Sequence, residues 1–368
     1  MFFRIVFPLV FLLGAAGMVY LGLRIRKFEF VRRWKWAGWL FAFGICPVSA
    51  WLFTWVLDLS VFNLVLILLH LVVFWMLCDF GWWLGSKIRG KLPRRYYAGM
   101  VAVGITVVYL GLGWFFAHHV FVTEYALTTE KDTGELCIVQ ITDAHIGVTL
   151  DGESFARELE KVNAQKPDAV VITGDFVDDD TTREDMLAAC EALGTLKTRY
   201  GVFFVYGNHD KGYFRGGTFT KEDLRDALIA NGVKILEDEV VQLGNTYREG
   251  VCYLVGRKDA SAKDRLSMEE LTKGLDPSIY TVVLDHQPTD FDAETKAGAD
   301  LTLCGHTHGG HIFPTGLVGV WFGGNDLCYG KEVRENSTFI VSSGISGWAM
   351  PFKTGCISEI VVIRIKGN

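Results

Sequence analysis

Acidic side chains are scarce in the first third of this sequence. Residues 1–123 contain 12 of the 36 Lys and Arg residues but only 3 of the 42 Asp and Glu residues, a net charge of +9. Residues 124–368 hold the other 24 basic and 39 acidic residues, which gives −15. This asymmetry indicates two domains, with a boundary between residues 123 and 124. The acidic second domain lacks the basic face that a nucleic-acid polymer would require, so we expect no such partner.

Closely spaced cysteine pairs are also missing. None of the eight cysteines belongs to a C-x-x-C motif, which argues against a zinc ribbon or a thioredoxin-like redox site. Most cysteines lie in apolar runs and are expected to be small core residues. The spacing specifies no disulfide. Internal repeats and low-complexity tracts are absent as well.

The first domain consists largely of long apolar runs. Crossing the hydrocarbon core of a bilayer requires about 20 apolar residues in a helix. Trp and Tyr residues cluster near the ends of these runs, as is typical of interfacial anchors. We therefore predict a transmembrane region over residues 1–123, with four helices at about Val6–Leu23, Trp36–Leu57, Val61–Leu84 and Ala98–Ala117.

The loops between these runs predict an orientation. The second loop is only Asp58, Leu59 and Ser60, whereas the first and third loops contain six and five Lys or Arg residues. The positive-inside rule places both basic loops in the cytoplasm, so the second domain is expected to be extracytoplasmic. A signal peptide is the alternative for the first run, but its basic residues follow the apolar stretch, with only Arg4 before it.

Two ionisable residues, His70 and Asp79, fall within the third apolar run. Such residues are candidates for a transport or proton-relay function. The structural alternative is that Asp79 reaches the membrane interface near the helix end, while His70 bonds to a neighbouring helix. Few other polar residues lie in the runs, which makes a transporter with an accessory domain the less favoured hypothesis.

The second domain alternates short apolar strands with helical segments, which predicts a layered α/β core. The expected helices are Glu153–Gln165, Thr182–Lys197 and Lys221–Asn231. The expected strands are Leu136–Ile141, Ala169–Ile172, Val202–Tyr206, Cys252–Val255, Tyr280–Leu284, Leu301–Cys304, Phe339–Ser342 and Ile357–Ile365.

Five of these strands are followed directly by Asp, Asn or His residues. Ligands of α/β sheets bind outside the carboxyl ends of the strands, so these side chains are expected to meet at one rim. Their oxygen and nitrogen atoms suit Mn, Fe or Zn. The five blocks are Asp143-Ala144-His145, Gly174-Asp175-Phe176-Val177-Asp178, Gly207-Asn208-His209-Asp210, Asp285-His286 and Gly305-His306-Thr307-His308.

Taken in order, these blocks resemble the motifs of the calcineurin-like metallophosphoesterase superfamily. The resemblance covers residues 135–368 and implies two mixed sheets stacked face to face and covered by helices, a four-layer α/β/β/α domain. Within the superfamily, the run Gly305–His311 and the N-terminal membrane segment resemble the membrane-anchored bacterial phosphodiesterases that are similar to lipid-sugar pyrophosphate hydrolases.

The resemblance also implies a role for each residue. One divalent cation would be bound by Asp143, His145 and His308, a second by Asn208, His286 and His306, and Asp175 would bridge them. His209 would protonate the leaving oxygen, and Asp178 would orient His209. We expect two ions of Mn, Fe or Zn, with Mn favoured, that provide a metal-bridging hydroxide to attack phosphorus.

The implied activity is hydrolysis of a phosphate ester, with phosphodiester or pyrophosphate bonds of lipid or envelope compounds as candidates. The alternative is a catalytically silent metal-binding sensor or scaffold on the same fold. Residues near the expected rim are candidate substrate contacts, namely Arg215, His311 and Asn325, although His311 could instead be structural. Asp210 is expected to hold its loop.

Overall fold

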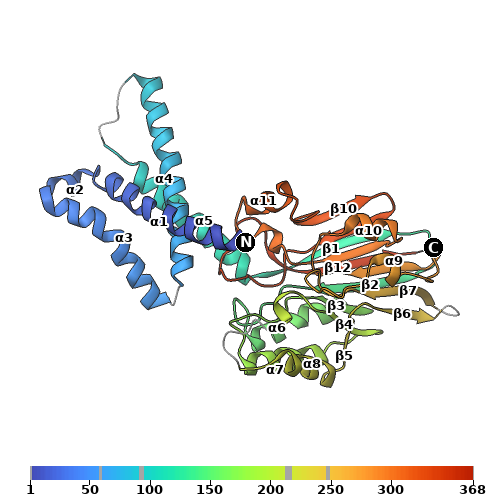
Figure 1. Ribbon diagram of the computed structural model, residues 1–368. Helices are drawn as coiled ribbons and strands as arrows, with labels where there is room; N and C mark the ends of the chain where they lie inside the picture. The colour runs from blue at the N-terminus through green and yellow to red at the C-terminus, as the bar shows by residue number, and fades with distance from the viewer. Residues whose placement is uncertain (1, 58–59, 91–94, 212–217, 246–248, 368) are drawn as a thin grey trace. The chain divides into compact units, whose positions relative to one another are not determined.

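The computed structural model describes residues 2–57, 60–90, 95–211, 218–245 and 249–367. It divides into two compact units, Met1–Leu112 and Gly113–Asn368, which we call the N-terminal and C-terminal units. The expected boundary at 123/124 lies beyond this division and falls inside a strand of the C-terminal unit. Figure 1 shows the elements of both units.

The N-terminal unit is helical. Four of its helices are long and apolar enough to cross a membrane, as the sequence predicted. Most of their large apolar side chains, including Trp36, Trp55 and Val107, are exposed, as suits contact with lipid. The helices are α1 (Phe2–Ile25), the short α2 (Glu29–Arg33), α3 (Lys35–Leu57), α4 (Val61–Arg89) and α5 (Ala98–His118), whose last turns belong to the C-terminal unit.

Asp79 does not simply reach toward an interface. Its Oδ2 lies 2.7 Å from Arg24 Nε and accepts a 2.8 Å hydrogen bond from Tyr20, while its Oδ1 accepts one of 2.5 Å from Tyr96. Asp79 of α4 therefore contacts α1 and the segment that precedes α5. The His70 ring lies 2.7 Å from Leu66 O of its own helix, so the expected bond to a neighbouring helix is not made through this atom.

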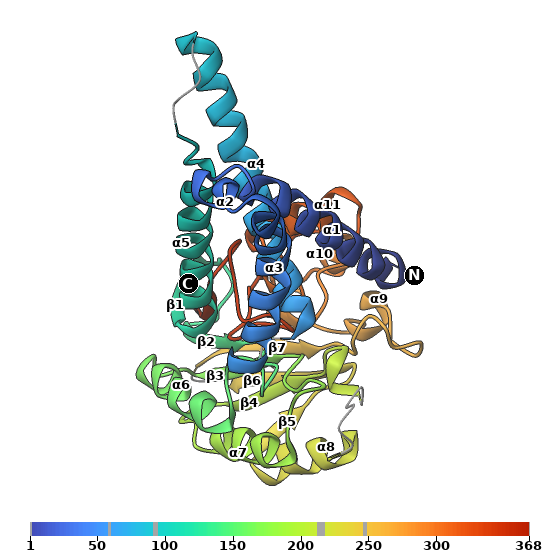
Figure 2. The same cartoon turned by 90° about the vertical axis from the view of Figure 1, so that its left-hand side faces the viewer.

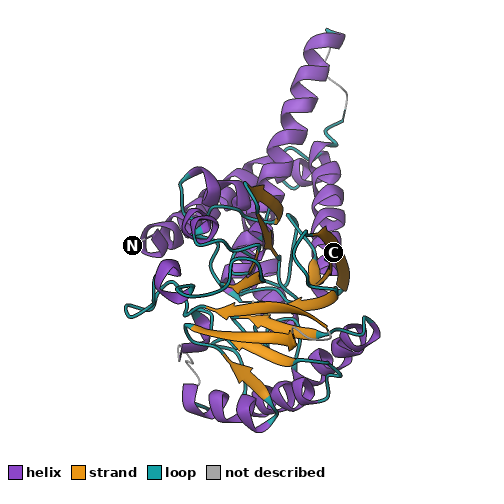
Figure 3. Ribbon diagram, turned by 90° about the vertical axis from the view of Figure 1, so that its right-hand side faces the viewer, coloured by secondary structure: helices purple, strands orange, loops and turns teal. Residues whose placement is uncertain are grey.

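The C-terminal unit contains two six-stranded mixed sheets, seen in orange in Figure 3. The first sheet has the order β1 (Val120–Thr128), β12 (Ser358–Lys366), β2 (Glu135–Ile141), β3 (Ala169–Thr173), β4 (Gly201–Val205) and β5 (Val233–Ile235). The second has the order β10 (Gly330–Arg334), β11 (Ser337–Val341), β9 (Leu301–Cys304), β8 (Tyr280–Leu284), β7 (Glu249–Gly256) and β6 (Glu239–Asn245).

Buried apolar side chains hold the two sheets face to face. Ile138 and Val171 of the first sheet pack in one core cluster with Leu254, Val282 and Leu303 of the second. Because side chains alternate along a strand, the neighbouring residues of β2 and β3 face the other way, toward the helices. The predicted four-layer α/β/β/α architecture is thereby confirmed.

Helices cover the outer face of each sheet. Figure 2 shows the first group, α6 (Gly152–Ala164), α7 (Arg183–Gly194) and α8 (Lys221–Ala230), on the side of the first sheet. Their starts are fixed by side chains of Asp151, Thr182 and Thr220 that accept hydrogen bonds from the first turn. The short α9 (Met268–Leu271) and α10 (Phe291–Lys296) lie against the second sheet, and α11 (Thr315–Trp321) follows β9.

This topology explains where the polar motifs lie. Strands β2, β3 and β4 are parallel neighbours in the first sheet, and β8 and β9 are parallel neighbours in the second. The carboxyl ends of parallel neighbours meet at one edge, so the five motif loops leave the sheets from two such edges.

Candidate metal centre

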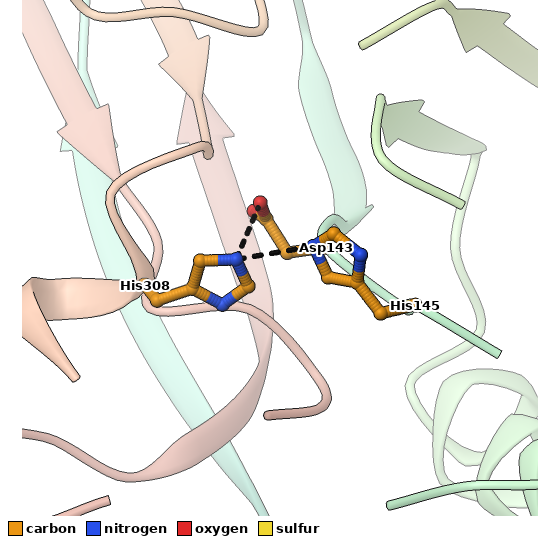
Figure 4. Close-up of side chains that lie close together, drawn as sticks. All are labelled: Asp143, His145 and His308. Carbon is orange, nitrogen blue, oxygen red and sulfur yellow. Dashed lines mark hydrogen bonds and ion pairs between the residues drawn. The ribbon is translucent and has the colours of Figure 1, made fainter. Parts of the chain in front are cut away.

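The first group of side chains consists of Asp143, His145 and His308, shown in Figure 4. The Nε2 atoms of His145 and His308 are 3.1 Å apart, and His308 Nε2 lies 3.4 Å from Asp143 Oδ1. All three side chains are buried. They come from loops after β2 and β9, which belong to different sheets.

The Asp143 carboxylate is held in place from two sides. It accepts 3.0 Å bonds from the backbone N–H of His306 and a 2.7 Å bond from the hydroxyl of Thr142. Gly305 makes this approach possible, because a Cβ there would lie 2.3 Å from Asp143 Oδ2. The glycine of the Gly305-His306 motif thus lets the two motif loops touch.

A second group contains Asp175, His286 and His306. His286 Nε2 lies 3.1 Å from Asp175 Oδ2 and 3.2 Å from Asn208 Oδ1. The other ring nitrogen, Nδ1, lies 2.8 Å from the backbone oxygen of Thr173 and donates its proton there. Such a bond to a backbone carbonyl typically orients a metal-binding histidine.

These contacts leave three acceptors facing one another. If the proton of His286 is on Nδ1, then Nε2 presents a lone pair to the oxygens of Asp175 and Asn208, and no donor lies between them. Such an arrangement is stable only with a positive charge at its centre, either an additional proton or a cation. The residues present therefore fit a divalent metal ion.

The pKa values of the clustered histidines are consistent with a positive charge at this position. Burial disfavours the charged form of His286, but the charge of Asp175 and the hydrogen bond with it raise the pKa of His286 to about 10. Burial and the charge of His286 lower the pKa of His306 to about 4, which keeps its ring neutral and able to bind a metal. Burial and His145 also lower the pKa of His308.

A third group joins His145, Asp178 and His209. His209 Nδ1 lies 2.9 Å from Asp178 Oδ1, and His145 Nδ1 lies 3.0 Å from Asp178 Oδ2. Burial opposes protonation of His209, but its hydrogen bond with Asp178 and the charge of Asp175 raise its pKa to about 9. One carboxylate thus contacts both the expected general acid and an expected metal ligand, a double contact that the motif spacing did not predict.

The backbone around these groups is unusual. Positive φ angles are uncommon for residues other than glycine and cost free energy, so their concentration in one place indicates a functional constraint. Five of the expected metal ligands have such angles, namely Asp143 (50°), His145 (36°), Asp175 (50°), His306 (69°) and His308 (49°).

Asp210 and Asp285 contribute to the loops around the centre. Asp210 accepts backbone hydrogen bonds from Gly207, Phe176 and Val177, so it joins the loops after β3 and β4. Asp285, beside His286, pairs with the buried Arg257 at 2.9 Å. Arg257 also lies 3.1 Å from Glu294, and no motif in the sequence indicated this buried charge network.

The expected substrate contacts are not all placed at the centre. Arg215 lies outside the described residues. His311 is buried, with its ring centroid 5.6 Å from that of His308. Asn325 lies beside Gly319 of α11, and within the described residues no hydrogen bond or ion pair joins it to the three groups. Trp348, in contrast, contacts the rings of both His209 and His308.

Known proteins with similar sequences contain the same kind of domain. The sequence model of the calcineurin-like phosphoesterase family matches residues 137–310. An uncharacterized metallophosphoesterase of Aquifex aeolicus is 30% identical over 254 residues, which cover 67% of this chain and 92% of that protein. A metallophosphoesterase of Campylobacter jejuni is 33% identical over 239 residues, 64% of this chain and 60% of that protein.

A relative from Bos taurus is described as a transmembrane protein with a metallophosphoesterase domain. It is 31% identical over 245 residues, which cover 63% of this chain and 53% of the relative. This chain therefore spans little more than half the length of several of the curated relatives it matches.

Proposed function

The chain belongs to the calcineurin-like phosphoesterase family, and from this premise we propose that it is a membrane-held phosphoesterase with two divalent cations. The observation that carries the proposal is the convergence of side chains from three motif loops, where His286 Nε2 lies 3.1 Å from Asp175 Oδ2 and 3.2 Å from Asn208 Oδ1. A cation at this point would satisfy all three.

The residues divide between two positions. Asp143, His145 and His308 would hold one cation, and Asn208, His286 and His306 the other. Asp175 would serve both, since its Oδ2 lies 3.1 Å from His286 Nε2 and 3.8 Å from His145 Nε2. When bound, such a pair would polarise a phosphoryl group and lower the pKa of a water molecule toward about 7.

His209 would supply the proton for the leaving oxygen. Its ring is partly exposed, at 22%, and its pKa of about 9 keeps it protonated near neutral pH. Asp178 would fix the ring by accepting the Nδ1 proton, so that Nε2 holds the proton to be transferred. General-acid help of this kind is typically worth about 10²–10⁴-fold in rate.

We further propose Mn²⁺ as the favoured metal and phosphodiester or pyrophosphate bonds of lipid or envelope compounds as substrates. The four membrane-length helices support a substrate that resides at a bilayer. The basic loops support an orientation in which the catalytic domain lies outside the cytoplasm. We take this domain as residues 124–368, from the boundary expected from the sequence. Protease treatment of right-side-out vesicles tests the orientation. An extracytoplasmic catalytic domain would be digested, whereas a domain that stays intact would lie on the cytoplasmic side and contradict the proposal.

The activity is tested with the full chain purified in detergent, with bis-p-nitrophenyl phosphate as substrate. We expect hydrolysis that requires added Mn²⁺, stops with a chelator, and is lost in Asp175→Asn. The matched control is Asp264→Asn, because Asp264 is exposed and its 2.8 Å contact with Lys258 lies at the surface. Full activity of Asp175→Asn would refute the proposed roles.

A further inference from the structure

Large apolar side chains are exposed on the segment that follows the last metal-ligand motif. Phe313, Trp321 and Phe322 are 62%, 74% and 85% exposed, and Leu317 and Val320 are exposed as well. They lie on or beside α11, a helix with no buried residue. We call these five residues the α11 surface.

The sequence segment that contains the α11 surface is uncharged. Residues 312–325 contain no Asp, Glu, Lys, Arg or further His. Contiguous exposed apolar patches on soluble domains mark contacts with proteins or membranes. Trp in particular is enriched where one side of a residue meets hydrocarbon and the other meets water.

The C-terminal end of α5 lies in the same unit, which begins at Gly113. The backbone N–H of Lys353 donates a 2.8 Å hydrogen bond to Gly113 O, and the Ser358 hydroxyl donates one of 2.9 Å to Ala117 O. A Cβ on Gly113 would lie only 2.7 Å from Thr354 Cγ2. The loop between β11 and β12 therefore packs directly on the last turns of an apolar helix of membrane-spanning length.

The same loop holds the start of the α11 surface. The Thr354 hydroxyl accepts a 3.1 Å hydrogen bond from Phe313 N, and the backbone N–H of Thr354 donates one of 2.8 Å to His311 O. The buried Lys353 fixes the loop by donating to the carbonyl oxygens of Ser343 and Gly344. One residue, Thr354, thus contacts both the end of α5 and the backbone that carries Phe313.

We propose that the α11 surface inserts into the interfacial layer of the bilayer that α5 spans. The link through Thr354 makes this surface continuous with a helix that is long and apolar enough to span that bilayer. A second copy of the chain is the weaker candidate, because standard protein interfaces use about 20–30 residues a side and the α11 surface has five. Interfacial insertion needs only a few aromatic and aliphatic side chains.

The proposal has a consequence for the substrate. His308 lies only five residues before Phe313, so insertion would hold the metal centre beside the lipid headgroups. This consequence rests on the proposed function, and it narrows the substrate class to phosphate esters presented by the headgroups of membrane lipids. The insertion itself does not depend on catalysis.

A photo-crosslinking experiment tests the insertion in the full chain. Phe322→p-benzoylphenylalanine is reconstituted into vesicles of phosphatidylethanolamine and phosphatidylglycerol, irradiated and analysed by mass spectrometry. The matched control is Ile229→p-benzoylphenylalanine, since Ile229 is an exposed apolar residue, at 51%, that lies on α8. We expect lipid adducts at position 322 in roughly tenfold excess over position 229, as burial of one aromatic side chain implies.

Equal adducts at both positions, no lipid adduct at position 322, or cross-links to a second copy there would overturn the proposal. Circular dichroism of both variants checks that the protein has folded, and bis-p-nitrophenyl phosphate hydrolysis is measured separately, since neither residue is a proposed metal ligand. Adducts at position 322 in a protein without hydrolytic activity would leave the insertion standing and refute the proposed function. Hydrolysis without lipid adducts at position 322 would refute the insertion and leave the proposed function standing.

Discussion

His209 and Asp178 are the residues whose roles can be separated most clearly. His209 contacts Asp178 through one ring nitrogen and is not among the six expected terminal ligands. His209→Ala is expected to lower kcat by about 10²–10⁴-fold, because it removes the proton donor. Metal content, measured by mass spectrometry, should not change.

The control for this variant is His119→Ala, which removes an exposed histidine far from the motifs in sequence. It should retain full activity. If His209→Ala released the metals instead, His209 would be a ligand and the general-acid role would be wrong.

Asp178→Asn is expected to behave differently, since Asp178 also contacts His145. Carboxylates that orient metal-bound histidines typically contribute about 10–100-fold to metal affinity or activity. Both Mn²⁺ affinity and kcat should therefore fall. A Mn²⁺ titration followed by hydrolysis measures both, and unchanged Mn²⁺ affinity would show that Asp178 acts on His209 alone.

At this scale the sequence predicted the identity of the clustered residues but not their contacts. The strand-end positions indicated that the motif side chains meet at one rim, and the family resemblance implied that Asp143, His145 and His308 belong together. Spacing alone could not show that Asp178 lies between two histidines, since His145 is brought to it by the packing of two separate loops. The role of each residue remains a prediction.

Among the secondary-structure elements, the eight expected strands are present, whereas β1, β5, β6 and β10 were not predicted. The expected Tyr280–Leu284 and Leu301–Cys304 strands are present as β8 and β9. β1 was not predicted, although Val120–Thr128 alternates in burial along its length. It follows α5 directly and pairs in parallel with β12 from the opposite end of the sequence, so no local pattern indicates its partner.

The end of β7, the end of β8 and α10 are joined by the Arg257 network. Arg257 lies 2.9 Å from Asp285 and 3.1 Å from Glu294, and all three side chains are buried. Arg257→Ala removes the cation beside the buried Glu294, while Asp285 keeps its contact with Arg265, and is expected to lower the free energy of unfolding by about 3–5 kcal/mol. Thermal or denaturant unfolding of the full chain in detergent measures this loss.

Arg157→Ala serves as the comparison, because Arg157 is exposed and pairs with Glu153 only at the helix surface. Such a pair is worth less than about 1 kcal/mol. Equal effects of the two substitutions would mean that the buried network contributes little to holding β8 and α10 together.

For the whole molecule, metal binding should couple to the stability of the C-terminal unit. The proposed ligands come from loops of both sheets, so bound cations would connect the two halves of the β/β core. Ligands that bind only the folded state stabilise it by about 4 kcal/mol at a thousand times Kd. Chelation should therefore lower the unfolding temperature, and added Mn²⁺ should restore it. An unfolding temperature insensitive to chelator would contradict this coupling.

The division of the chain followed from composition, whereas the arrangement of the sheets did not. Four long apolar runs and a shift from net positive to net negative charge indicated a membrane region and a separate domain. The order of twelve strands in two sheets depends on pairings between segments far apart in the sequence. The four-layer architecture was expected only because the motifs resemble a family of known fold.

The central claim is that side chains from five strand ends bind two cations. The most direct test is the metal-to-protein ratio of the full chain after dialysis against Mn²⁺, measured by inductively coupled plasma mass spectrometry for the wild type and Asp175→Asn. The account predicts about two ions per wild-type chain, as in two-metal phosphatases, and fewer in the variant. A wild-type protein without bound metal, or the same ratio in both proteins, would contradict it.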